Sequence, residues 1–131
     1  MRRLGALLLA LLLAGCALGT DVRGVLRERF GAPVASAQGE TWRSPDDPAR
    51  TADLLVGEVE PLARRADAGS EHVRFDDDVV VITPDPSGGS TVLAEDLDGR
   101  YRTGGFAHLG PGFSPGSPAA GEDDGGPGDA K

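Results

Sequence analysis

The chain has 131 residues, enough for one small domain. Its formal net charge is −8 at pH 7, and an acidic protein is repelled by nucleic acid and by anionic lipid headgroups. We therefore expect no nucleic-acid partner. The 20 glycines and 10 prolines cluster in predicted loops and toward the C-terminal end, so the middle of the chain can still fold.

The first residues have the parts of a bacterial export signal. Arg2 and Arg3 make a short positive start, Leu4–Ala14 is an apolar run, and small residues then precede Cys16, the only cysteine. The apolar run is shorter than the roughly 20 residues that a transmembrane helix needs. Residues 1–15 are therefore expected to form a cleaved signal peptide.

The residues around the cysteine resemble a bacterial lipobox. Leu13, Ala14 and Gly15 occupy the three positions before Cys16. The resemblance implies that signal peptidase II recognises these three residues and cuts before Cys16, whose thiol carries diacylglycerol. Such an anchor holds firmly, because each buried CH₂ contributes about 0.8 kcal/mol. We expect a lipid-anchored protein on the extracytoplasmic face of the cell membrane, with residues 16–20 as the lipidated tether.

Residues 21–113 are expected to form the folded domain, which begins with a helix. Asp21 is a good N-cap for a helix running to about Phe30, with its apolar residues mostly on one face. The stretch 32–43 has no periodicity and is expected to be a loop.

A second helix is predicted across Thr51–Glu60. Asp47 and Pro48 make a cap and first-turn signal ahead of it. Pro61 would break or kink the helix near its end. The residues that follow, Arg64 and Arg65, are assigned to a possible last turn.

After Gly69 the pattern changes to short β-branched runs separated by turn residues. Three strands are predicted, with a fourth short one near residues 100–103: Glu71–Phe75, Val79–Thr83 and Ser90–Glu95. Helices first and strands afterwards favour an α+β domain, in which two N-terminal helices pack on a three- to four-stranded antiparallel meander. Residues 114–131 offer little to bury and are expected to form a disordered tail.

This layout resembles domain-of-unknown-function family 4247, small lipoproteins of Gram-positive bacteria. The motifs that carry the resemblance are a lipobox, a short helix, the run Val73–Pro84, the turn Gly88–Ser90, and Tyr101-Arg102 followed by an aromatic-x-His-x-Gly element at Phe106–Gly110. The match covers roughly residues 21–110. The family brings no established activity, so the resemblance concerns identity more than function.

Two acidic clusters are candidates for a divalent cation. Asp76–Asp78 offers carboxylates, but aspartate also favours hairpin turns, and we prefer the turn. Glu95–Gly99 contains Asp-x-Asp-Gly, a fragment of a calcium loop that lacks the other EF-hand ligands. We expect no metal or other cofactor.

The two histidines and three arginines are the remaining candidates. His72 is interpreted as a surface strand residue, and His108, with Asp96 or Asp98, is the tentative ligand or functional group. Arg74, Arg100 and Arg102 could form a basic patch, although ion pairs with Glu71, Glu95 or Asp96 are favoured.

The sequence therefore predicts an envelope lipoprotein, anchored to the membrane and of unknown activity, whose domain is a non-enzymatic binding or accessory module with a possible envelope protein partner. Two alternatives stay open. One is a small hydrolase or ligand-binding enzyme that uses His108. The other is a weak binder of divalent cations.

Overall fold

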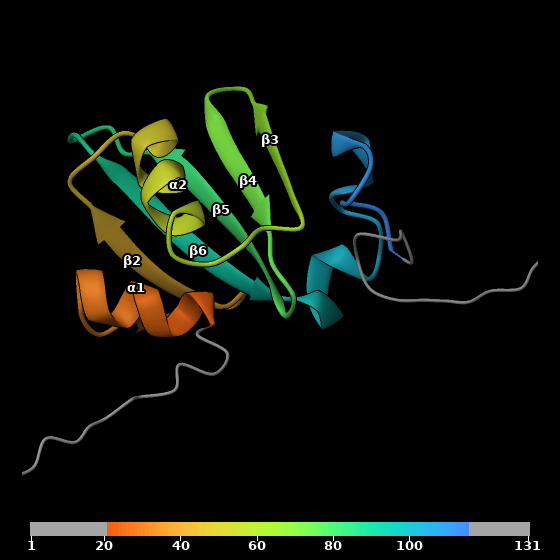
Figure 1. Cartoon of the computed structure of the whole chain (residues 1–131), viewed down its shortest axis with the longest axis horizontal. Coiled ribbons are helices and arrows are strands. Elements are labelled where there is room, and N and C mark those ends of the chain that lie inside the picture. The colour runs from red at the N-terminus through yellow and green to blue at the C-terminus, as the bar shows by residue number, and fades with distance from the viewer. Residues whose placement is uncertain (1–20, 116–131) are drawn as a thin grey trace, which may run out of the picture.

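The computed structural model describes residues 21–115, which form one six-stranded antiparallel sheet with two helices on one side and the C-terminal segment on the other (Figure 1). The strand order is β1-β2-β6-β5-β4-β3. The elements are α1 (Val22–Phe30), β1 (Val34–Ala35), β2 (Glu40–Ser44), α2 (Pro48–Val56), β3 (Ala63–Asp67), β4 (Ser70–Arg74), β5 (Asp78–Pro84) and β6 (Ser90–Asp96), followed by the short helical turns Leu97–Tyr101 and Ala107–Leu109.

The expected fold, two helices on a meander of three to four strands, is wrong. The region 32–43, expected to be a loop, contains β1 and most of β2. β2 pairs with β6, with Trp42 opposite Val92. The segment Ala63–Asp67, partly assigned to the end of the second helix, is the edge strand β3, paired with β4. The fourth strand expected near residues 100–103 is absent from the described residues, where the chain is helical or turning instead.

The physical reason for these errors is the polar character of β2 and β3. β3 is a partly exposed edge strand with two arginines, so it lacks the apolar alternation that marks a strand. In β2 the buried positions are a tryptophan and a serine, and glycine precedes the strand. Both strands form because neighbouring strands pair with them, and that pairing is not visible in their own composition.

The two predicted helices are present, with the predicted N-caps. The Asp21 carboxylate accepts a hydrogen bond from the Gly24 backbone N–H at 3.1 Å, and the Asp47 carboxylate accepts one from Arg50 N–H at 2.8 Å. The second helix begins at Pro48 and ends at Val56, four residues before the predicted end at Glu60. The three predicted strands correspond to β4, β5 and β6, with each end within one residue of its predicted position, and β5 lies inside the sheet as expected.

The sheet has a separate hydrophobic core on each face, because successive side chains of a strand point to opposite faces. Val80 and Ile82 of β5 join the core beneath α1 and α2. Val79 joins a second core with residues from the segment 97–115: Tyr101, Phe106, Leu109 and Phe113. We call this segment the C-terminal cover.

The predicted signal peptide (1–15) and tether (16–20) lie outside the described residues, as does all of the predicted tail except Ser114 and Pro115. Ser114 accepts a hydrogen bond from the Tyr101 hydroxyl at 3.0 Å through its backbone oxygen. Within residues 21–115, no helix has the length and apolar character needed to cross a membrane.

Candidate functional site

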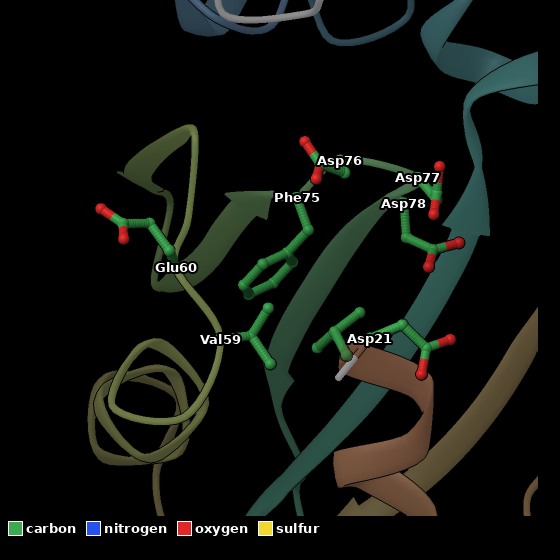
Figure 2. A pocket seen from close by; sticks show the side chains of 8 residues that line it. Asp21, Val59, Glu60, Phe75, Asp76, Asp77 and Asp78 are labelled. Carbon is green, nitrogen blue, oxygen red and sulfur yellow. The ribbon is translucent and has the colours of Figure 1, made fainter. Parts of the chain in front are cut away.

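A cavity of about 140 Å³ opens where the start of α1, the loop after α2 and the β4–β5 turn meet (Figure 2). Its floor is apolar and its rim is acidic. It is lined by Asp21, Val22, Val59, Glu60, Phe75, Asp76, Asp77 and Asp78. Figure 2 shows that the labelled carboxylates point in different directions, with Glu60 directed away from the three aspartates of the turn.

The arrangement of these carboxylates favours a turn over a cation site. The Phe75 N–H donates to the Asp78 backbone oxygen at 2.8 Å, which closes the β4–β5 turn and confirms the preferred interpretation of Asp76–Asp78. Among residues 21–115, no group of three or more His, Cys, Asp or Glu side chains could hold a metal ion.

Arg23 of α1 is the electrostatic centre of this end of the domain. Its guanidinium donates to the Asp78 carboxylate at 3.0 Å, to Glu40 at 3.0 Å and to Asp96 at 3.2 Å. Burial raises the pKa of the Asp78 carboxyl, and Arg23 partly offsets that rise. One arginine therefore ties α1 to β2, β5 and β6. In this network Asp96, a tentative functional residue, is part of a structural ion-pair cluster.

The structure does not pair His108 with either of its proposed carboxylate partners. His108 is exposed and lies 3.8 Å from the Asp67 carboxylate at the end of β3. Asp98 is also exposed and accepts a hydrogen bond from Arg102 at 2.8 Å. The three tentative residues thus have three separate sets of contacts. Cys16 and the predicted peptidase recognition residues 13–15 lie before the described part of the chain.

The three arginines of the predicted basic patch also have separate environments. Arg100 pairs with the buried Glu95, as the favoured ion-pair interpretation expected, and Arg102 pairs with Asp98. Arg74 is fully buried, and within residues 21–115 none of its guanidinium nitrogens has a hydrogen-bond partner. Its guanidinium carbon lies 5.0 Å from the centroid of the Tyr101 ring.

The interpretation of His72 as a surface residue is wrong. Its exposed fraction is 8%, and its ring makes an edge contact with Phe106 at a centroid distance of 6.0 Å. The C-terminal cover buries this position, and the cover is not apparent from the sequence of β4. Burial lowers the pKa of His72, so the ring is neutral at pH 7. Its Nδ1 atom has no hydrogen-bond partner in the described part of the chain.

The sequence profile of the family described as Domain of unknown function (DUF4247) matches residues 9–126. The chain belongs to this family. The match extends over both helices, the whole sheet and the C-terminal cover, so these elements together form the described part of a DUF4247 protein.

Relatives of this DUF4247 protein occur in Mycobacterium tuberculosis. The uncharacterized protein MT2674 of strain CDC 1551 and the uncharacterized protein Rv2599 of strain H37Rv are each 29% identical to it over 102 residues. The aligned region is 78% of this chain and 71% of each relative. No solved structure matches the chain significantly.

The sequence of this DUF4247 protein contains one signal that His72 and Arg74 are buried, which was not predicted. His72 and Arg74 alternate with Val73 and Phe75, so a strand that buries Val73 must turn both polar side chains to the other face. That face becomes an interior only if another segment covers it. The sequence indicates such a covering segment by four spaced apolar residues: Tyr101, Phe106, Leu109 and Phe113.

Proposed function

We propose that this protein is a lipoprotein of the bacterial cell envelope, held on the outer side of the membrane by a diacylglyceryl group on Cys16. Its domain acts there as a non-enzymatic binding or accessory module. The observation that carries the proposal is the short spacing between the lipobox cysteine and the folded domain. Helix α1 begins at Val22, directly after its N-cap Asp21.

The spacing limits how far the domain can move from an anchored cysteine. An extended chain spans at most about 3.3–3.6 Å per residue, so the five steps from Cys16 to Asp21 reach no more than roughly 18 Å. Asp21 also lines the acid-rimmed cavity. An anchored domain would therefore keep this end close to the membrane surface and direct the opposite end outward.

The charge of the protein supports a lipid anchor over electrostatic attachment. The formal net charge is −8, and the end nearest the tether carries Glu60, Asp76 and Asp77 on the cavity rim. Anionic headgroups repel such a surface. Stable attachment therefore needs the apolar contribution of acyl chains.

The anchor is tested with Cys16→Ser in a bacterial host, using metabolic labelling with a radioactive fatty acid and membrane fractionation. The variant should lose the label and accumulate as unprocessed or released protein. Thr20→Ser, a substitution within the tether that keeps the cysteine, is the matched control and should retain label and membrane location. Labelling that persists in Cys16→Ser would overturn the proposal.

The binding role is tested by crosslinking intact cells and purifying the protein from solubilised membranes. A defined envelope protein should be recovered with wild type in repeated experiments, and lost when the crosslinker is omitted. Recovery of only the abundant membrane proteins seen in a mock purification counts against a binding module. The alternative of an enzyme using His108 predicts that His108→Ala abolishes a cellular phenotype without changing the melting temperature.

A further inference from the structure

The second face of the sheet holds a buried cation that has no counter-charge within the part of the chain that the structure describes. Arg74 has an exposed fraction of 0%, and its Nε, Nη1 and Nη2 atoms have no hydrogen-bond partner among the described residues. The other two fully charged side chains buried in residues 21–115 are paired, Asp78 with Arg23 and Glu95 with Arg100. Removing a charge from water without pairing it is strongly unfavourable. Arg74 is thus the one buried charge whose environment is incomplete.

The neighbours of Arg74 offer only part of what a guanidinium needs. The Tyr101 ring supplies a cation–π contact at 5.0 Å, but it leaves all five N–H donors without acceptors. His72 lies two residues earlier on the same face of β4, and its Nδ1 atom also lacks a partner. A fork of N–H donors beside an imidazole is the donor set that binds an oxyanion, either a carboxylate or a phosphate group.

An open groove reaches the aromatic ring that covers Arg74. The groove has a volume of about 410 Å³ and is lined by Leu97, Asp98, Tyr101, Arg102 and Pro115. Tyr101 therefore contacts the groove and the Arg74 guanidinium at the same time. The Asp98 carboxylate on the groove wall is paired with Arg102, which offsets its repulsion of an incoming anion.

The C-terminal cover is held to the sheet by side-chain packing and by polar contacts such as the Arg100–Glu95 ion pair. It has no strand pairing with β3 to β6 in the described structure, and its direct polar attachments include Arg65 Nε to the Leu109 backbone oxygen at 2.9 Å. Gly104, Gly110 and Gly112 have positive φ values of 87°, 98° and 92°. These glycines can change conformation at low cost.

We propose that Arg74 and His72 form the floor of an oxyanion-binding site, reached from the groove when the Tyr101 ring moves aside. The ligand is a small molecule or headgroup that presents a carboxylate or phosphate. Its oxygens accept from the Arg74 guanidinium in a bidentate arrangement, and the cover closes over the rest of the molecule. The inference does not depend on the lipid anchor, because it rests only on contacts within the described residues 21–115.

The test is a thermal melt of the full-length protein in neutral detergent, with inorganic phosphate or acetate compared with chloride at matched ionic strength. A ligand that binds only the folded state raises the melting temperature with the logarithm of its concentration once that concentration exceeds Kd. For a domain of this size the rise is about 10 °C or more at a hundredfold excess over Kd. A rise with phosphate alone or with acetate alone, relative to chloride, identifies the group that is recognised. A wild-type protein that responds to neither overturns the proposal.

Arg74→Met separates binding from folding. Because an apolar residue of similar size removes an unpaired buried charge, the variant should melt at the same or a higher temperature without ligand, and should lose the anion-dependent rise. Arg50→Met removes an exposed arginine from α2 and is the matched control that keeps the rise. An Arg74→Met protein with an undiminished rise would refute the site.

A second measurement covers the case in which Arg74→Met does not fold. The Nε–Hε signal of Arg74 in a ¹⁵N spectrum of wild-type protein should shift progressively and saturate as phosphate or acetate is added. The corresponding signal of Arg50 should not follow the same curve. An Arg74 signal that remains unchanged through both titrations overturns the proposal, whatever the stability of the variant.

Discussion

Replacing Phe113 with alanine tests whether the C-terminal cover belongs to the cooperative fold. Phe113 has an exposed fraction of 0% and packs in the second core with Tyr101, Phe106 and Leu109. Truncating a fully buried phenylalanine costs about 3–5 kcal/mol. At roughly 0.05–0.15 kcal/mol per residue, the 95 described residues have a total stability of about 5–14 kcal/mol. The substitution should therefore remove a large part of the free energy of unfolding.

This cost has an upper limit if the cover can open by itself. If the cover detaches while the sheet stays folded, a substitution in the cover can cost no more than the free energy that holds the cover on the sheet. Any further weakening of the cover then leaves the stability of the sheet unchanged. The chain offers a separate probe for each core. Its only tryptophan, Trp42, is buried beneath the helices, and its only tyrosine, Tyr101, is buried under the cover.

The assay is urea unfolding followed by Trp42 fluorescence and by the near-ultraviolet circular dichroism of Tyr101. If the domain is one unit, Phe113→Ala lowers both midpoints together. If the cover opens separately, only the Tyr101 transition moves. Val34→Ala, at a position whose exposed fraction is 69%, is the control and should change both by less than about 0.5 kcal/mol. Should Phe113→Ala shift neither transition by more than that control, the packing of the cover on the sheet would be refuted.

Three further substitutions test other features of the fold. Arg23→Met leaves the buried Asp78 carboxylate without its ion pair and should lower the free energy of unfolding by about 3 kcal/mol in urea titrations, a loss that fails to appear if Arg23 is only a surface residue. Because burial lowers the pKa of His72 below its usual 6.5, the unfolded state binds more protons as pH falls below about 6.5. Wild type should accordingly lose stability between pH 7 and pH 5.5, and His72→Gln should show a weaker loss; identical pH profiles would contradict this. Gly39→Ala places a Cβ 2.0 Å from a backbone oxygen of β6 and should cost about 1–3 kcal/mol or more by thermal melting, whereas Gly99→Ala meets nothing within 4 Å and should avoid that steric cost.

The sequence alone predicted the elements that carry their own local signals. Asp21 and Asp47 marked the helix starts because an N-cap acts within a few residues of the chain. The strands around Val79–Ile82 were visible because β-branched runs between strong turn signals have few other solutions. These features need no knowledge of distant residues.

The features that were missed depend on segments far apart in the chain. Residues 40–44 contain no local signal of their pairing with β6. Their partners lie far along the chain, as the register Trp42↔Val92 shows. In the same way, His72 and Arg74 have the composition of an exposed strand face until the C-terminal cover buries them. The tentative site at His108 failed to assemble for a related reason, because sequence proximity to Asp96 and Asp98 did not produce contact with either.

The position of β2 beside β6 also determines when this chain can fold. Strands β3 to β6 each pair with a strand that is adjacent in sequence. On its inner side, β2 pairs with β6, so this pairing cannot form before β6 is present. Contacts between distant segments form late because closing a long loop costs entropy before any contact compensates it. During synthesis, the N-terminal third therefore has no completed sheet to pack against until residues 90–96 have emerged. If the protein is exported as proposed above, this delay would help to keep the chain extended until it has crossed the membrane.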